Sequence, residues 1–77
     1  HHFDHSSAAH QLRQATGELP LKQRLVFTLS FYEEMTYEEI ARLLRCSLGT
    51  VASRKHAAVR KLASKLRRLA PEKFPRA

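Results

Sequence analysis

The chain has 77 residues, 43% of them hydrophobic, and its 14 Lys and Arg against 7 Asp and Glu give a formal net charge of +7 and a pI of about 10.4. This length suits a single small domain, and such a charge favours a polyanionic partner such as nucleic acid. One cysteine excludes an internal disulfide and a cysteine-based zinc site, and no run approaches the roughly 20 apolar residues that span a membrane.

Residues 1–7, HHFDHSS, show no periodicity and hold three of the five histidines. A His/Asp cluster could bind a metal, but this composition is more typical of a residual purification tag or a disordered leader. We therefore expect residues 1–7 to lie outside the fold, residues 8–70 to form one domain, and residues 71–77 to form an irregular tail.

A short first helix is predicted from about Ser7 to Thr16. Ser6 or Ser7 can cap its start, and Gly17 can end it. Its apolar side is narrow and consists of Ala8, Leu12 and Ala15.

A second helix is predicted to begin at Leu19-Pro20, because a proline in the first helical position loses no hydrogen bond. Apolar residues follow at helical spacing and cover more than one face of this helix. The residues expected in the core are Leu25, Val26 and Leu29. Phe27 and Phe31 fit either the core or a surface that docks a partner.

Local signals define the start of a third helix at Thr36. Thr36 and Glu39 have the spacing of a capping box, and Met35 and Ile40 have that of a hydrophobic staple. The apolar stripe of this helix is Tyr37, Ile40, Ala41 and Leu44.

The stretch Arg45-Cys46-Ser47 breaks the helical pattern. Ser47 can cap a fourth helix, with Cys46 and Val51 as a second staple. Arg45 occupies the place in the turn where Gly or Asn is usual, so a left-handed conformation there costs energy. The pattern predicts a helix-turn-helix.

The fourth helix is predicted from about Leu48 to Leu69, ending before Pro71, and Phe74 is expected to anchor the tail to the core. Its expected core stripe is Leu48, Val51, Ala58, Val59, Leu62, Leu66 and Leu69. Lys55 falls within this stripe, so either its stem lies along the core or it lies beyond the cover of the third helix. The predicted fold class is all-α: a small four-helix domain with a helix-turn-helix and a long C-terminal recognition helix.

The fourth helix is apolar on one face and cationic on the other. Between Ile40 and Pro71 the chain has no acidic residue and nine basic ones, Arg42, Arg45, Arg54, Lys55, Arg60, Lys61, Lys65, Arg67 and Arg68. This one-sided field suits nucleic acid, and the alternative is a solvated basic face. A basic amphipathic helix could also lie on a membrane, but its apolar stripe is needed for the core, so no membrane partner is expected.

A helix of this kind fits the major groove of DNA, and its first two turns lie closest to the base edges. The residues there that point away from the predicted core are Gly49, Thr50, Ser53, Arg54, His56 and Ala57. Gly49 permits close approach to a phosphate, and Arg54 can bridge a guanine or hold a phosphate. The residues expected to act further along as electrostatic anchors are Arg60, Lys61, Lys65 and Arg67.

The chain contains, in order, Leu19-Pro20, Gln23-Arg24, Val26-Phe27, Leu29, Thr36 to Ala41, Leu44, Ser47, Gly49 to Val51 and Ser53-Arg54. This ordered set, within about Leu19 to Leu69, resembles region 4 of bacterial sigma factors of the extracytoplasmic-function group. The resemblance implies a domain that recognises the promoter −35 element in double-stranded DNA and contacts the flap of the RNA polymerase β subunit. It also implies that an anti-sigma factor can mask the domain.

The resemblance places DNA contacts at Tyr37, Thr50, Ser53 and Arg54. The sequence departs from the family pattern where basic residues are usual, with Ala52 before Ser-Arg, Ala57 three residues after Arg54, and Ser30 shortly before the third helix. The full set of expected DNA-binding residues is Tyr37, Gly49, Thr50, Ser53, Arg54, His56, Arg60 and Lys61.

The leading hypothesis is the DNA-binding domain of a sigma factor, acting in the cytoplasm. The alternative is a sigma-like protein-interaction module that binds an anti-sigma factor or polymerase with little specific DNA binding, which Ala52 and Ala57 favour. A general helix-turn-helix effector domain fits less well, because of the Leu-Pro-x-x-Gln-Arg stretch. No carboxylate pair, nucleophile with a base, Gly-rich loop or metal constellation is visible, so no enzyme, cofactor, metal or small-molecule substrate is expected.

Overall fold

The computed structural model describes residues 8–69, 71 and 72, and this part of the chain is built from helices and turns. The elements in order are α1 (Ala8–Gly17), α2 (Leu21–Phe27), the π-helical turn η1 (Thr28–Tyr32), α3 (Tyr37–Leu44) and α4 (Leu48–Leu69). The predicted all-α class is confirmed. The leader, the caps proposed at Ser6 or Ser7, and Phe74 lie outside the described residues.

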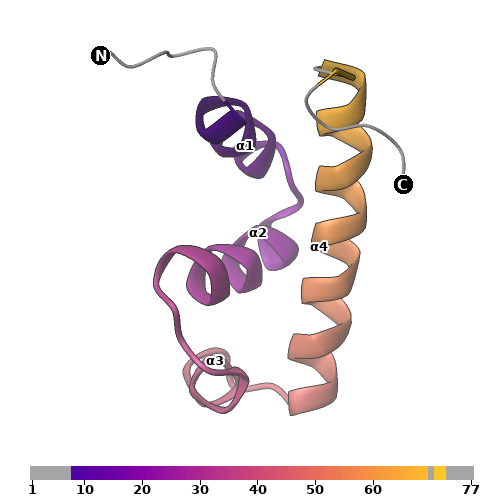
Figure 1. Ribbon diagram of the computed structural model, residues 1–77. Coiled ribbons are helices and arrows are strands. Elements are labelled where there is room, and N and C mark those ends of the chain that lie inside the picture. The colour runs from indigo at the N-terminus through magenta and orange to yellow at the C-terminus, as the bar shows by residue number, and fades with distance from the viewer. Residues whose placement is uncertain (1–7, 70, 73–77) are drawn as a thin grey trace.

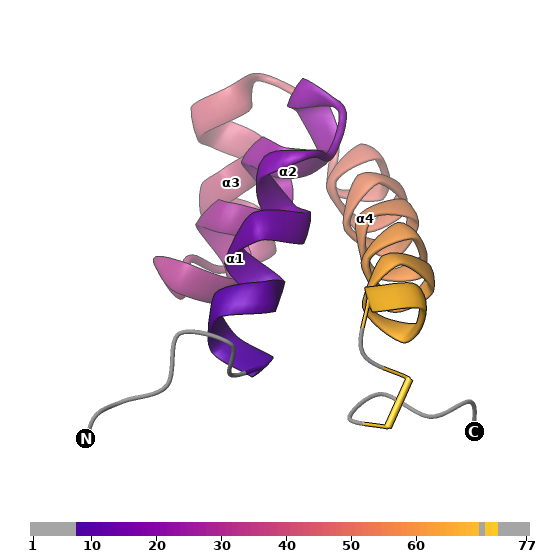
Figure 2. The ribbon, with the colours of Figure 1, turned by 90° about the horizontal axis from the view of Figure 1, so that it is seen from above.

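The long helix α4 forms one side of the molecule. Figure 1 shows α1, α2 and α3 stacked along it, with α3 nearest its start and α1 nearest its end, and all three contact it. Seen from above, α1 lies over α2 and α3 while α4 stands apart on the other side (Figure 2). One helix therefore holds the other three together.

Two clusters of buried side chains lie along α4. The cluster near its end consists of Ala15, Leu19, Phe27, Ala58, Leu62 and Leu66, and the cluster near its start consists of Val26, Ile40, Ala41 and Val51. Val26 and Phe27 are neighbours in α2, yet each belongs to a different cluster. Burial of each large aliphatic or aromatic side chain is worth about 1.5–3 kcal/mol.

Side-chain caps define the starts of α3 and α4. The Thr36 hydroxyl accepts a hydrogen bond from the Glu39 amide at 3.1 Å, and the Glu39 carboxylate accepts one from the Thr36 amide at 2.8 Å. At the next helix the Ser47 hydroxyl accepts from the Thr50 amide at 3.0 Å. Met35 and Cys46 pack against the cluster near the start of α4, so both predicted staples are present.

The turn between α3 and α4 has the strained geometry that the sequence predicted. Arg45 lies in the left-handed region, with φ 57° and ψ 52°. Its amide donates to the Ala41 carbonyl, and the Cys46 amide donates to the same oxygen at 3.0 Å. Two bonds to one carbonyl at the end of α3 offset part of the cost of the left-handed conformation.

The second helix differs from its prediction at both ends. Pro20 is the N-cap, one residue before the helix, with an extended ψ of 148°, and its carbonyl accepts from the Arg24 amide at 2.9 Å. At the other end the helix widens into η1, whose bonds run from residue i+5 to residue i, as from Glu33 to Thr28. This wider turn lets Phe27 stack on Phe31 at 5.2 Å and meet Tyr32 edge-on at 6.2 Å.

Several residues predicted to be core are exposed instead. They are Leu25 (39% exposed), Leu48 (48%), Val59 (44%) and Leu69 (57%), and Ala8 in α1 is exposed as well. Leu48 and Leu69 lie at the two ends of α4, where little of the other helices remains to cover them. Of the two phenylalanines that the sequence left open, Phe27 is buried and Phe31 is 52% exposed.

Candidate nucleic-acid interface

The start of α4 presents backbone amides and small side chains to solvent. Gly49 is exposed, and a Cβ added to it would meet only the Ser47 hydroxyl, at 3.8 Å. The amides of Leu48 and Gly49 have no acceptor within the helix, as is general for a first turn. The Thr50 hydroxyl accepts from Ser47 at 3.0 Å and keeps its own hydrogen to donate. This end of α4 suits a phosphate.

The predicted DNA-binding residues of α4 fall into two rows, given about 100° of rotation per residue. The outer row, opposite the buried stripe, consists of Gly49, Ser53, His56 and Arg60, all exposed. The side row, about a quarter-turn away, consists of Thr50, Arg54 and Lys61, of which Lys61 is exposed and the other two are half-buried. From Thr50 to Lys61 the helix rises about 16.5 Å, which is more than the roughly 12 Å width of the major groove.

Tyr37 lies in neither row. It is the first residue of α3, and its ring faces the Lys55 ammonium at 5.7 Å from the ring centroid. The same ammonium donates to the Ser30 hydroxyl at 2.8 Å. Lys55 is thus held between η1 and α3, which explains how a lysine occupies the apolar stripe of α4.

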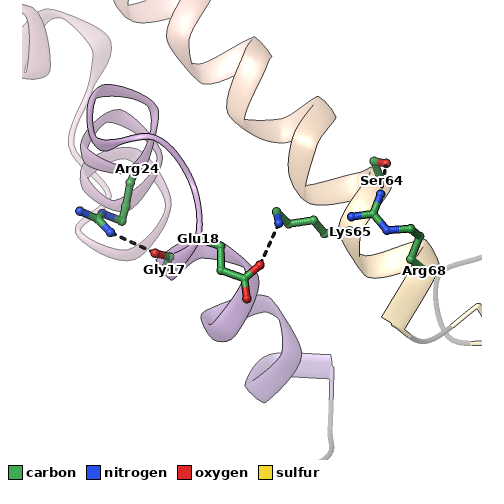
Figure 3. A network of polar contacts seen from close by, with 6 residues as sticks. All are labelled: Gly17, Glu18, Arg24, Ser64, Lys65 and Arg68. Atoms are coloured by element: carbon green, nitrogen blue, oxygen red, sulfur yellow. Dashed lines mark hydrogen bonds and ion pairs between the residues drawn. The ribbon is translucent and has the colours of Figure 1, made fainter.

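The basic side chains of α4 differ in whether they already have a hydrogen-bond or ion-pair partner. The Lys65 ammonium forms an ion pair with Glu18 at 2.8 Å, and Arg68 donates to Ser64 at 3.3 Å (Figure 3). The side chains of Arg60 and Lys61 form no hydrogen bond or ion pair with another residue in the described part of the chain. Arg60 and Lys61 therefore remain available to phosphates, whereas Lys65 has a counter-charge already.

The Glu18–Lys65 pair also shifts the pKa of the Glu18 carboxyl. The hydrogen bond and the charge of Lys65 lower the pKa of Glu18 below its ordinary value, with a smaller contribution from Arg68. Beside it, the Arg24 guanidinium donates to the Gly17 carbonyl at 3.0 Å (Figure 3). These contacts fasten the turn between α1 and α2 and leave the start of α4 untouched.

A shallow hollow of about 350 Å³ opens on the exposed face of α4, lined by Ala57, Arg60, Lys61 and Ser64. Ala57, where the resemblance implies a basic residue, contributes only a short side chain to this lining. Two of the four lining residues are basic, so the hollow remains suited to an anion despite the departure at Ala57.

A larger, apolar hollow lies on another side of α4. It has a volume of about 500 Å³ and is lined by Leu12, Phe27, Phe31, Lys55, Val59, Leu62, Ala63, Leu66 and Arg67. Sequence reasoning did not predict this site, because it had placed Val59 in the core. The signal in the sequence that could have identified this site was Phe31. It widens the apolar surface of the second helix beyond one face, and the sequence had left open that such a surface docks a partner.

The described residues contain no group of three or more His, Cys, Asp or Glu side chains that could hold a metal ion. None of their helices combines the length and the apolar character needed to cross a membrane.

Comparison with known proteins identifies the family. No curated protein matches the sequence significantly. The family model for sigma-70 region 4 matches residues 9–62, which reach from α1 into α4 and include every predicted DNA-binding residue. Region 4 is a DNA-binding regulatory domain and not an enzyme family; it generally binds promoter −35 DNA and contacts RNA polymerase. Because the match covers well over half of the chain, this protein belongs to the sigma-70 region 4 family.

Proposed function

We propose that this chain is the −35-reading domain of a sigma factor of the extracytoplasmic-function group, working in the cytoplasm with α4 as its recognition helix. One observation carries the proposal: from Ile40 to Pro71 the chain has no acid, and α4 carries two rows of polar and basic residues, one opposite its buried stripe and one about a quarter-turn from that row. A surface of this shape and sign fits the major groove.

The start of α4 would hold one phosphate. The first-turn amides point along the helix axis, Gly49 admits close approach, and the Thr50 hydroxyl has a hydrogen to donate. These contacts would position the helix without reading sequence.

The second and third turns would read bases. Ser53 and His56 are exposed in the outer row, and Arg54 extends from the side row. Arg54 is the residue best suited to specificity, because its guanidinium can bond both acceptors of a guanine. Arg60 and Lys61, one to two turns further along, would hold phosphates.

Tyr37 would contribute from α3. Its ring rests against the Lys55 ammonium, which fixes its direction at the start of the helix. A tyrosine hydroxyl there can donate to a phosphate on the DNA strand that passes α3.

Fluorescence anisotropy with a labelled promoter-like duplex and a scrambled duplex, titrated over a range of salt concentrations, tests the proposal. We expect tighter binding to the promoter-like duplex, a steep salt dependence, and loss of the preference in Arg54→Ala. Lys61→Gln should weaken binding to both duplexes alike and reduce the salt slope by about 0.9, the value for one phosphate contact. Arg13→Gln, which removes an equal charge from the exposed surface of α1, is the matched control. Equal binding of the wild-type protein to both duplexes would contradict the proposal that this domain recognises a specific DNA sequence.

We further infer that the apolar hollow is where the flap of the polymerase β subunit docks. Phe31 and Val59 are exposed on its walls, and exposed aromatic side chains in a concave apolar surface are typical of protein contacts. Phe31→Gln should weaken binding of a purified flap fragment by tenfold or more. Leu43→Gln, at an exposed leucine on α3 outside the hollow, should leave binding unchanged.

The alternative function is a protein-interaction module that binds an anti-sigma factor and reads DNA little. Ala57 and the exposed Ala52 favour it, since both positions lack a basic side chain. The two functions separate in the same titration: a DNA reader binds duplex at low salt, and an interaction module does not.

A further inference from the structure

The side chain of Lys55 begins in the apolar stripe of α4 and ends beside the start of α3. Its ammonium donates a hydrogen bond to the hydroxyl of Ser30, in η1, at 2.8 Å. The same nitrogen lies over the ring of Tyr37, the first residue of α3, at 5.7 Å from the ring centroid. Elements η1, α3 and α4 therefore meet at one cation, next to a side chain that the proposed function places on DNA.

This cation has no counter-charge within the described part of the chain. The partners that it has there are a neutral hydroxyl and a neutral ring, whereas Lys65 on the same helix is paired with Glu18. An ammonium has three N–H groups, and the Ser30 hydroxyl accepts only one of them. A half-buried charge with neutral partners keeps part of the cost of leaving water, and a bound anion would offset that cost.

Tyr37 provides a second donor at the same place. Its side chain is 36% exposed, and its hydroxyl forms no hydrogen bond with another described residue. Lysine and tyrosine side chains both donate to DNA phosphates, and the two non-bridging oxygens of one phosphate can accept from two donors. The ammonium and the hydroxyl can therefore bind the same phosphate.

Ser30 gives an independent reason to expect a phosphate here. It is one of the three positions where the resemblance implies a basic side chain and the sequence has none. The 2.8 Å contact brings the ammonium of Lys55 to this position from another helix. The charge that is absent from the sequence at Ser30 is thus present at that place in the fold.

We propose that Lys55 is a further DNA-binding residue, which shares one backbone phosphate with the Tyr37 hydroxyl and replaces the basic side chain missing at Ser30. A phosphate contact adds affinity and positions the domain but does not read bases. The inference rests on the proposed function and adds a contact to it. The sequence pattern had assigned Lys55 to the apolar stripe of α4 and not to the DNA-binding residues.

Duplex binding over a range of salt concentrations tests the role of the charge. Lys55→Met keeps an apolar stem and removes the ammonium, so it should weaken binding about tenfold at low salt and reduce the salt slope by about 0.9. Addition of Ser30→Arg to Lys55→Met should restore both quantities, because it returns a cation to the same place from η1. Lys22→Met, the same substitution at an exposed lysine of α2, is the matched control and should leave the slope unchanged.

A purely structural Lys55 predicts a different result. Loss of its contacts would then lower the Tm in thermal unfolding, while the folded Lys55→Met protein would keep the wild-type salt slope. We expect instead that the Tm stays level or rises, since methionine suits the apolar stripe of α4. Circular dichroism verifies that each variant is folded.

Duplexes in which a single phosphate is replaced by an uncharged methylphosphonate locate the contact. One replacement should weaken binding of the wild-type protein, and the same replacement should have less effect on Lys55→Met and on Tyr37→Phe, because each variant has already lost part of that contact. If the two variants respond at different phosphates, the shared phosphate is wrong.

The outcomes distinguish this inference from the proposed function. If the wild-type protein binds no duplex at low salt, the proposed function fails and the inference fails with it. If the wild-type protein binds DNA, and Lys55→Met keeps both its affinity and its salt slope, the proposed function stands and the DNA contact of Lys55 alone is wrong.

Discussion

Ser47 allows the folding role and the DNA role of the start of α4 to be measured separately. Its hydroxyl accepts a hydrogen bond from the Thr50 amide at 3.0 Å. Ser47→Ala therefore removes one cap and leaves that amide to be hydrogen-bonded by water. Loss of such a cap costs about 1 kcal/mol. For a domain of this size, that corresponds to a fall in Tm of about 4–8 °C.

Ser47→Asp should show the opposite pattern. Aspartate caps as well as serine, and its charge is favourable at a helix N-terminus, so the Tm should stay level or rise. The same charge would stand beside the proposed phosphate site. At about 6 Å from a phosphate the repulsion is about 0.7 kcal/mol in water and about 2.8 kcal/mol at an effective dielectric constant of 20. DNA affinity should fall by a factor of about 3 to 100.

Thermal unfolding followed by circular dichroism and duplex binding by anisotropy, both on the same samples, provide the two measurements. Ser53→Ala is the control for stability, because Ser53 is exposed in the same helix and alanine is the better helix former. An unchanged Tm in Ser47→Ala would refute the capping role. Wild-type DNA affinity in Ser47→Asp would show that the start of α4 does not face a phosphate.

Three further predictions concern the fold. Ile40→Val, at a fully buried site, should lower the free energy of unfolding by about 0.5–1.5 kcal/mol in urea denaturation, while Leu43→Ala at an exposed site should change it by less than about 0.5 kcal/mol. Arg45→Gly should raise the Tm, because glycine accepts the left-handed conformation that costs other residues about 1–2 kcal/mol; a lower Tm would contradict this. Because Lys65 lowers the pKa of Glu18, their pair stabilises the fold above pH 4.5 and loses its effect as the pH falls through the lowered pKa. Glu18→Gln should therefore flatten the dependence of Tm on pH below 4.5, and an unaltered profile would count against the pair.

The features predicted best from the sequence are those encoded within a few neighbouring residues. Three local features are confirmed: the capping box at Thr36, the cap at Ser47 and the bounds Leu48–Leu69 of α4. Each of the two caps is a contact between residues three positions apart. The left-handed Arg45 follows from the same local reasoning, since Arg45 occupies the place in the turn where Gly or Asn is usual.

Features that depend on tertiary contacts were missed. Periodicity identifies the side of α4 that faces the core, but not how far the neighbouring helices extend, so Leu48, Val59 and Leu69 were assigned to the core wrongly. The π-helical turn at Thr28–Tyr32, in which the Glu33 amide donates to the Thr28 carbonyl at 3.1 Å, was also missed.

The DNA-binding residues stay a prediction. Their arrangement in an outer row and a side row on α4 follows from helical geometry alone. What the sequence could not show is which cations are already engaged. Glu18 and Lys65 are 47 positions apart, and Ser30 and Lys55 are 25 apart. Contacts over such separations leave no pattern in a single sequence, and the difference between an engaged Lys65 and an available Lys61 emerges only from the fold.

The division of the core at Val26 and Phe27 has a consequence for how the domain opens. Detachment of α1 would uncover Ala15 and Phe27 but leave Val26 and Val51 sealed against α3. Amide hydrogen exchange should therefore show two opening units, with the helix-turn-helix retaining protection after α1 has lost it. The half of α4 that carries the predicted base-reading residues would keep its shape through fluctuations that loosen the other half.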